Sequence, residues 1–213
     1  MISQNSELLY SAVVSDALDA MGHFNQCAKP GLSALTVSRK LIGRCRTTLW
    51  ADLFHKDPAP YEKELQAVDS LTAGDVVIAA AHGSMRSGIW GELLTTAATN
   101  RGCLGAVIEG AIRDVSKMRE YDFPVYALGA CPLDSQNRQR VCDVDVSVEL
   151  CGVIVNSGDL IVADEDGIVF VPQAVEEEVI QFALNKINDE NQVRDAIRNG
   201  MLATEAYAQF GVL

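Results

Sequence analysis

The sequence lacks the short motifs of several large enzyme classes. Its 213 residues contain no Gly-x-Gly-x-x-Gly loop, no P-loop and no Gly-x-Ser-x-Gly elbow. Those motifs bind dinucleotides, bind nucleotide phosphates or present a nucleophilic serine. The chain therefore gives no sign of a nucleotide-dependent enzyme, of a methyltransferase with a glycine-rich nucleotide loop, or of a serine hydrolase.

The sequence also has few residues typical of zinc sites. The 3 histidines, His23, His55 and His82, are scattered along the chain, and we expect loop or core roles for them. None of the 6 cysteines belongs to a Cys-x-x-Cys pair. Because several cysteines stand in apolar stretches, we expect mostly reduced, buried thiols. Disulfides or metal ligation remain the alternative.

Long apolar runs and an excess of positive charge are missing as well. No run approaches the roughly 20 apolar residues of a membrane-spanning helix, and the segment Met1–Glu7 lacks the basic start of a signal peptide. We therefore expect a cytoplasmic protein. Lys and Arg number 17 against 29 Asp and Glu, which gives a net charge of −12. Such a surface disfavours nucleic acid as the main ligand but leaves a basic protein partner open.

What the chain does contain is a mixed α/β pattern, which we interpret as one domain over residues 1–213. Helical spacing predicts helices over 6–21, 58–69, 88–100, 115–121, 174–198 and 203–209. Strands are expected around a bend in 34–50 and over 76–80, 106–108, 125–128, 144–150, 153–155, 160–163 and 168–171. The central alternation of strand and helix predicts parallel pairing. The charged segment Glu62–Glu64 favours a surface position for the start of its helix.

Arg113-Asp114 is the pair most suggestive of chemistry. It follows the apolar run Ala106–Ile108 and Gly110, so it lies just past an expected buried strand, where sites in α/β sheets are common. A guanidinium binds a carboxylate or an oxyanion through two parallel hydrogen bonds, and a carboxylate binds a hard divalent cation. A second interpretation stays open, in which Asp114 only caps a helix.

The segment Gly88–Leu94 is a second candidate. If a helix begins between Gly88 and Gly91, its first backbone N–H groups have no partners within the helix and are available to an anion. Glycine there lets a ligand approach the backbone. The alternative is that the glycines only permit close packing.

Taken together, Gly91–Leu94, Gly110 and Arg113-Asp114 resemble the 4-hydroxy-4-methyl-2-oxoglutarate / 4-carboxy-4-hydroxy-2-oxoadipate aldolases, a family that also holds the regulator of ribonuclease activity A. The resemblance extends over most of the chain, through Pro124–Ala127, Gly158–Gly167, Val171-Pro172 and Phe210–Leu213. It implies a swivelling β/β/α fold of mixed strands with a long C-terminal helix. It also implies assembly into trimers or hexamers, with sites between neighbouring subunits.

The resemblance further implies Mg²⁺ or Mn²⁺ and a role for each matching residue. Asp114 matches the direct metal ligand, and Arg113 matches the arginine that binds the pyruvate unit and stabilises its enolate. Gly91 and the backbone N–H groups of Leu93 and Leu94 match the segment that holds the pyruvate carboxylate.

Glu92 matches an acidic residue that reaches the metal through water, although many members have Asp there. An acidic residue given by the adjacent subunit matches Glu190 best. The implied enzyme is a lyase, a class II pyruvate aldolase with oxaloacetate decarboxylase activity that acts on a small 2-oxo acid.

A different class of function is a non-catalytic protein that binds and regulates a ribonuclease. The acidic surface suits a basic partner, but the presence of both Arg113 and Asp114 favours the enzyme. The substrate beyond the pyruvate unit depends on loops, among which we include those around His82 and Arg86.

Overall fold

A curled sheet of nine strands organises the chain in this computed structural model, which describes residues 6–211. The main path runs β1-β6-β5-β3-β2-β10-β11, with β4 beside β5 and β7 beside β2. The strands are β1 Ser33–Ala34, β2 Leu41–Asp52, β3 Asp75–Ala80, β4 Gly88–Trp90, β5 Gly105–Ile112, β6 Val125–Ala130, β7 Gln139–Val144, β10 Leu160–Ala163 and β11 Ile168–Val171. A separate hairpin pairs β8 Val148–Leu150 with β9 Val153–Val155.

Helices flank this sheet and extend beyond it. They are α1 Ser11–Ala20, α2 Glu62–Asp69, α3 Glu92–Asn100, α4 Val115–Met118, α5 Glu176–Arg198 and α6 Ala203–Phe210, with 3-10 turns at Ser6–Leu8 and Gln173–Val175. The mixed α/β fold with a curled sheet and a long C-terminal helix confirms the fold class expected from the sequence. Residues 1–5 and the last two residues of the Phe210–Leu213 motif lie outside the described part.

The central strands are parallel, as the alternation of strand and helix predicted. β3 lies between β2 and β5 in parallel register, and β5 continues the parallel order to β6. All six residues of β3 are buried, because both faces of the sheet are covered. Val77 and Ala79 face α2 and α3, whereas Ile78 faces the β8–β9 hairpin and β11.

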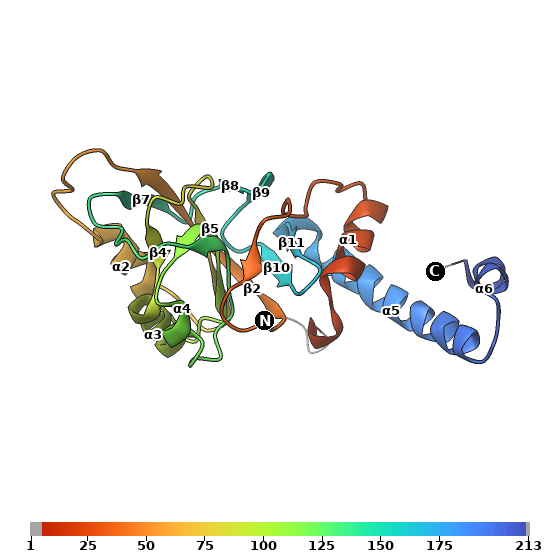
Figure 1. Cartoon of the computed structure of the whole chain (residues 1–213). Coiled ribbons are helices and arrows are strands. Elements are labelled where there is room, and N and C mark those ends of the chain that lie inside the picture. Colours follow the sequence, from red (N-terminus) through yellow and green to blue (C-terminus); the bar gives the residue numbers. More distant parts are fainter. Residues whose placement is uncertain (1–5, 212–213) are drawn as a thin grey trace.

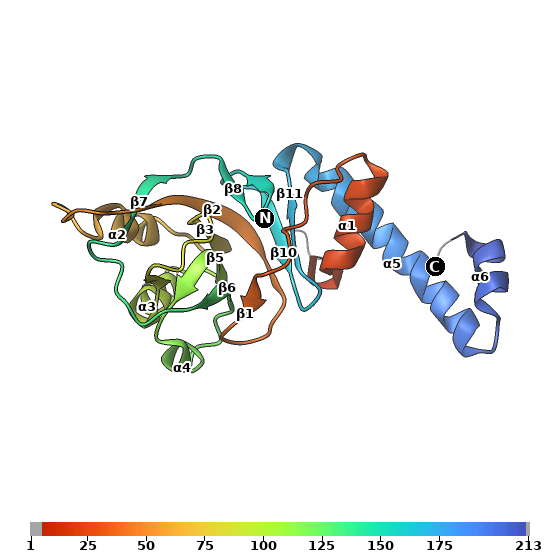
Figure 2. The ribbon, with the colours of Figure 1, turned by 45° about the horizontal axis from the view of Figure 1, so that its top comes forward.

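The two ends of the molecule differ in character (Figures 1 and 2). α2, α3 and α4 gather at one end beside the parallel strands, and α5 runs outward from the other end to α6. α1 packs between α5 and the outer face of the β10–β11 hairpin, where Val13, Leu160 and Val179 share one apolar cluster. Among the described residues, no helix is long and apolar enough to cross a membrane.

Two sequence-based assignments were wrong at their boundaries. Gly88–Trp90 is a buried strand parallel to β5, so α3 starts only at Glu92 rather than near Gly88. The apolar residues of Gly88–Trp90 fit a helical spacing, but they fit equally well a strand that is buried on both faces. The alternating run 144–150 is two strands in different sheets, because the chain bends after Val144.

The strands expected around a bend in 34–50 are confirmed, since the end of β1 and most of β2 lie on either side of a bend at Leu35–Thr36. β2 also has a register irregularity between Leu49 and Trp50. Two smaller expectations needed correction. The first helix is interrupted before Ser11. All six cysteines are free, but only Cys45 and Cys103 are buried.

Candidate active site

A cavity of about 290 Å³ opens beside the end of β5, at the α2–α4 end of the molecule. Its lining comes from four segments: the start of α2, residues 88–94 of β4 and α3, Arg113-Asp114 after β5, and Asp134-Ser135 before β7. The structure therefore brings Gly91–Leu94 and Arg113-Asp114, the two candidate segments of the sequence, into one cavity.

Asp114 turns its carboxylate toward the start of α3. It stands at the cap position of α4 with φ 56°, in the left-handed region, and makes no side-chain cap hydrogen bond. Non-glycine residues seldom adopt that conformation, and such residues cluster at functional sites. The backbone N–H of Glu92 instead donates to Asp114 Oδ2 at 3.4 Å. The capping role that the sequence left open is thus absent.

Gly91 makes this approach possible. A Cβ placed on Gly91 would lie 2.8 Å from Asp114 Oδ2 and 3.1 Å from Arg113 Cγ, both closer than ordinary contact. Its φ of −156° is extended, so the lack of a side chain, not the backbone conformation, is what the position requires. Gly88 is restricted in the same way by Arg113 Cβ, at 2.8 Å.

The first turn of α3 offers backbone donors to the cavity. The N–H groups of Leu93 and Leu94 lack partners within the helix because they belong to its first turn. Gly91 at the cap position has no side chain to accept hydrogen bonds from them. The Leu93 side chain is 76% exposed, which places this turn at the cavity's open edge. A carboxylate at this helix start would gain hydrogen bonds and a favourable helix dipole.

Arg113 is fixed between two carboxylates. Its Nη1 donates to Asp134 Oδ2 at 2.6 Å, and its Nε lies 3.7 Å from Asp114 Oδ2. The Tyr61 hydroxyl donates to the other oxygen of Asp134, Oδ1, at 2.6 Å. Partial burial opposes ionisation of Asp134, but the hydrogen bond from Tyr61 and the charge of Arg113 outweigh it and lower its pKa. Asp134 is therefore a charged anchor for the guanidinium.

Two hydroxyl groups contact the Glu92 carboxylate. Tyr121 donates to Glu92 Oε1 at 3.0 Å. The Thr96 hydroxyl, one helical turn further on, lies 3.3 Å from the same oxygen, 2.9 Å from Tyr121 Oη and 3.0 Å from the backbone oxygen of Glu92, and its single proton serves one of these three acceptors at a time. These contacts restrict a side chain that is one methylene longer than Asp.

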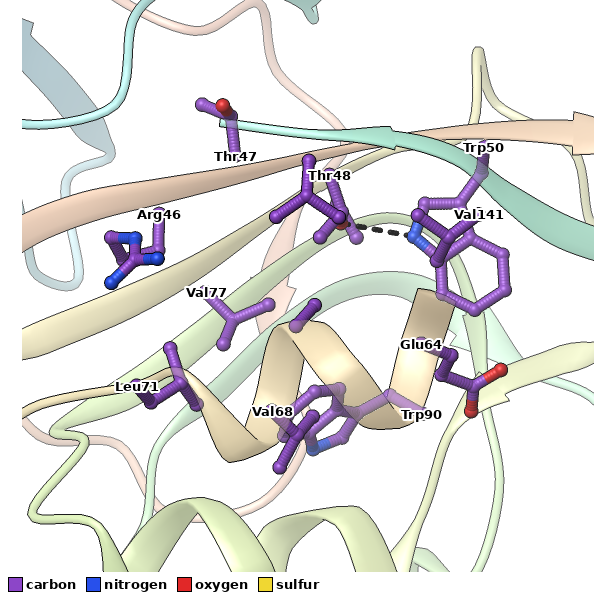
Figure 3. A pocket seen from close by; sticks show the side chains of 13 residues that line it. Arg46, Thr47, Thr48, Trp50, Glu64, Val68, Leu71, Val77, Trp90 and Val141 are labelled. Carbon is purple, nitrogen blue, oxygen red and sulfur yellow. Dashed lines mark hydrogen bonds between the residues drawn. The ribbon is translucent and has the colours of Figure 1, made fainter. Parts of the chain in front are cut away.

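Glu64 separates the cavity from the interior. It lines both the open cavity and a narrow apolar pocket behind α2. Figure 3 shows its carboxylate pointing away from Val68, Leu71 and Val77. Burial raises the pKa of Glu64 to about 7, the negative charge of Asp134 adds to the rise, and Arg113 opposes it. The sequence pattern had placed Glu64 on a surface helix; instead its side chain is almost fully enclosed.

The donor set suits a cation that keeps much of its water. Among residues 6–211, no three His, Cys, Asp or Glu side chains converge as a ready-made metal site. The Asp114 carboxylate has only weak partners, the Glu92 N–H at 3.4 Å and Arg113 Nε at 3.7 Å. Glu92, which gives that N–H, adds a second carboxylate to the cavity lining. Mg²⁺ is commonly held by one or two carboxylates plus water and substrate oxygens, so these residues fit such an ion.

Other candidates of the sequence lie elsewhere. Glu190 is on α5, outside this cavity, where its carboxylate accepts a hydrogen bond from Tyr10 at 2.8 Å. His82 lines a separate surface hollow, and Arg86 stacks on Phe54 at 4.2 Å from the ring centroid. The loops around His82 and Arg86 therefore do not line the cavity, contrary to expectation. Their place is taken by the start of α2 and the loop before β7.

Three cavity residues escaped the sequence reasoning: Tyr61, Glu64 and Asp134. Tyr61 and Asp134 are 73 residues apart and belong to no motif. One weak signal was available, since Tyr61-Glu62-Lys63-Glu64 follows two prolines and mixes an aromatic residue with charge.

The chain is similar in sequence to one protein family and to individual known proteins. A family model described as RraA-like, Aldolase/RraA, matches residues 11–170. A protein of Halalkalibacterium halodurans named "Putative 4-hydroxy-4-methyl-2-oxoglutarate aldolase" is 29% identical over 196 residues, covering 92% of this chain and 88% of that protein. Protein DlpA of Legionella pneumophila is 28% identical over 196 residues, but the chain spans only 31% of DlpA.

A solved structure shares the fold. It is that of Streptomyces coelicolor RraAS2, described as an unusual member of the RNase ES inhibitor RraA protein family. The two superpose with a TM-score of 0.78 at 28% identity, over 88% of this chain and 92% of that one.

The buried Glu64 gives a testable pH dependence of stability. Between about pH 4.5 and 7 the folded chain keeps a proton on Glu64 that the unfolded chain has lost, so rising pH lowers the free energy of unfolding. The full effect is at most about 3 kcal/mol. Urea unfolding at pH 5 and pH 8 should therefore show Glu64→Gln gaining stability relative to wild type as pH rises. The exposed neighbour Glu62→Gln should track wild type; parallel behaviour of all three proteins would contradict the assignment.

Proposed function

The chain belongs to the RraA-like Aldolase/RraA family, and from that membership we propose that it is a divalent-metal-dependent pyruvate aldolase. It cleaves 4-hydroxy-2-oxo acids such as 4-hydroxy-4-methyl-2-oxoglutarate to pyruvate, and it decarboxylates oxaloacetate. One observation carries the proposal: Asp114, Arg113 and the uncapped first turn of α3 face a single cavity, in which Gly91 leaves room for the Asp114 carboxylate.

The metal, Mg²⁺ or Mn²⁺, is assigned to Asp114, with Glu92 acting on it through water. When bound, such an ion supplies Lewis-acid activation of a 2-oxo acid. Support comes from the Asp114 carboxylate, which has no capping role, and from the two hydroxyls that contact Glu92.

Substrate orientation follows from the donors at the cavity. The N–H groups of Leu93 and Leu94 receive the carboxylate of the pyruvate unit, where the helix dipole favours negative charge. Arg113 retains N–H donors beyond the one given to Asp134, and it directs them at the 2-oxo oxygen.

The charge that develops during bond cleavage explains the role of Arg113. The hydroxyl proton leaves C4–OH, the C3–C4 bond breaks, and its electron pair moves into the pyruvate fragment as an enolate. Arg113 stabilises that charge without reorganising, because Asp134 and Tyr61 already fix its position. Glu92 orients the water that takes the hydroxyl proton and that later returns a proton to C3. Decarboxylation of oxaloacetate needs the same enolate stabilisation.

The proposed assembly is a trimer or hexamer in which a neighbouring subunit completes the site. Glu190 is the proposed donated residue. Its position on α5, at the far side of the molecule from its own cavity, is compatible with reaching another copy and incompatible with serving its own (Figure 1).

A non-catalytic regulator of a ribonuclease is the second candidate. RraAS2 is described as belonging to an RNase ES inhibitor family, and the net charge of −12 suits a basic partner. Recovery of a stoichiometric ribonuclease complex from protein that is inactive as an aldolase would favour this function over the enzyme.

The enzyme is tested by substituting Asp114. Asp114→Asn keeps the size of the side chain but removes the charge that binds a cation. We expect it to lower metal-dependent pyruvate release by about 100-fold or more with an unchanged circular dichroism spectrum. A coupled pyruvate assay over several 4-hydroxy-2-oxo acids and oxaloacetate, with and without chelator, measures this.

The matched control for that test is Asp122→Asn, an exposed Asp beyond α4 that does not line the cavity. It should retain wild-type activity. No pyruvate from any substrate with Mg²⁺ or Mn²⁺, or full activity in Asp114→Asn, would overturn the proposal.

A further inference from the structure

Tyr121 connects the apolar core to the candidate site from behind Glu92. It follows α4 in the turn before β6, and its backbone N–H donates to Met118 O at 3.1 Å. Its half-buried ring packs against the apolar cluster that includes Trp90, Met118 and Phe123. Its hydroxyl lies 3.0 Å from Glu92 Oε1. Tyr121 is not among the residues that line the cavity, so its hydroxyl acts on the site through Glu92.

The hydroxyl proton of Tyr121 goes to Glu92 rather than to Thr96. Tyr121 Oη has two neighbours that can accept a hydrogen bond, Glu92 Oε1 at 3.0 Å and Thr96 Oγ1 at 2.9 Å. A carboxylate can only accept, and hydrogen bonds to an ionised acceptor are about twice as strong as those between neutral groups. The Thr96 proton is shared among Tyr121 Oη, Glu92 Oε1 and the backbone oxygen of Glu92. Tyr121 is therefore the persistent donor to the carboxylate.

The two carboxylate oxygens of Glu92 consequently differ. Oε1 accepts the Tyr121 hydroxyl, while Oε2 has no hydrogen-bond partner within residues 6–211. Glu92 is the first residue of α3, and it lines the cavity. Holding Oε1 restricts the rotation of the carboxylate, so the position of Oε2 becomes defined as well. The free oxygen is thus available, at a defined place, to a group inside the cavity.

We propose that Tyr121 is a positioning residue for Glu92, and that its hydroxyl holds Oε1 so that Oε2 orients the water between Glu92 and the cation. The inference rests on the proposed aldolase function and adds a residue to it. It also explains how the chain accommodates Glu where many family members have Asp. Glu has one more rotatable bond than Asp, so its carboxylate needs an additional point of attachment to be held as firmly.

The length of the side chain makes positions 92 and 121 interdependent. An Asp at position 92 would withdraw the carboxylate by about 1.5 Å, the length of one carbon–carbon bond. Its oxygens would then lie beyond the roughly 3 Å at which O–H···O hydrogen bonds form. The Tyr121 hydroxyl should therefore matter in the wild-type chain and lose its effect when residue 92 is Asp. A merely structural contribution of Tyr121 would be the same in both chains.

Tyr121→Phe tests the proposal, because it removes the hydroxyl and keeps the ring. We expect the Kd for Mn²⁺, measured from the free-ion signal in electron paramagnetic resonance, to rise by about tenfold. At saturating Mn²⁺, kcat for pyruvate release from 4-hydroxy-4-methyl-2-oxoglutarate should fall by a similar factor. KM should change by less than about twofold, because the groups assigned to substrate binding are untouched.

The same substitution in a Glu92→Asp chain is the second arm of the test. There we expect Tyr121→Phe to change the Kd for Mn²⁺ by less than about twofold, so that the two substitutions are not additive. The matched control is Tyr126→Phe, which removes a tyrosine hydroxyl that donates to Arg39 O at 3.3 Å, outside the cavity. It should bind Mn²⁺ as wild type does, and circular dichroism should show the same fold for all the variants.

The outcomes distinguish this inference from the function on which it rests. An unchanged Kd in Tyr121→Phe, or an equal rise in the wild-type and Glu92→Asp chains, would overturn the role of Tyr121 and leave the aldolase in place. Wild-type protein that neither binds Mn²⁺ nor releases pyruvate would overturn both.

Discussion

The close approach of the Asp114 carboxylate to the start of α3 is the constraint on which the candidate site depends. A Cβ on Gly91 would lie 2.8 Å from Asp114 Oδ2, so any larger residue there would push the Asp114 carboxylate out of its place. Two further contacts maintain the approach. The Arg113 backbone N–H donates to Trp90 O at 2.8 Å, and β4 pairs with β5. The sheet thereby brings an acidic side chain to a helix start that itself attracts anions, an arrangement that a cation and an anionic substrate together would stabilise.

An excess of carboxylates over cations shapes the rest of the cavity. Arg113 lies between Asp114 and Asp134, the hydrogen bond from Tyr61 helps Asp134 stay ionised, and the pKa of the buried Glu64 is raised to about 7. Each of these responses limits the cost of holding negative charges close together. The same excess accounts for the proposed cation.

The sequence identified the two segments at the centre of the candidate site, but it did not identify the residues that surround them. Local pattern marked Arg113-Asp114 and Gly91–Leu94 as candidates, because one follows a buried strand and the other opens a helix, and the family resemblance supplied their expected roles. Tyr61 and Asp134 could not be identified in this way, because their contact joins segments 73 residues apart. Local pattern also predicted a helix at Gly88–Trp90, which is a strand, and one strand over 144–150, which belongs to two. In both places the pairing with strands elsewhere in the chain decides the structure. Helical spacing and alternation describe burial, and they do not specify which strand lies alongside.

The central claim is that Asp114 and the first turn of α3 together hold a cation and the carboxylate of a 2-oxo acid. Crystals soaked with Mn²⁺ and oxalate test it most directly, because Mn²⁺ is identified by its anomalous scattering. The account predicts a single strong peak beside the Asp114 carboxylate, with an oxalate carboxylate at the N–H groups of Leu93 and Leu94. A cavity that contains neither ion nor oxalate, or a peak bound by other residues with Asp114 unchanged, would contradict it.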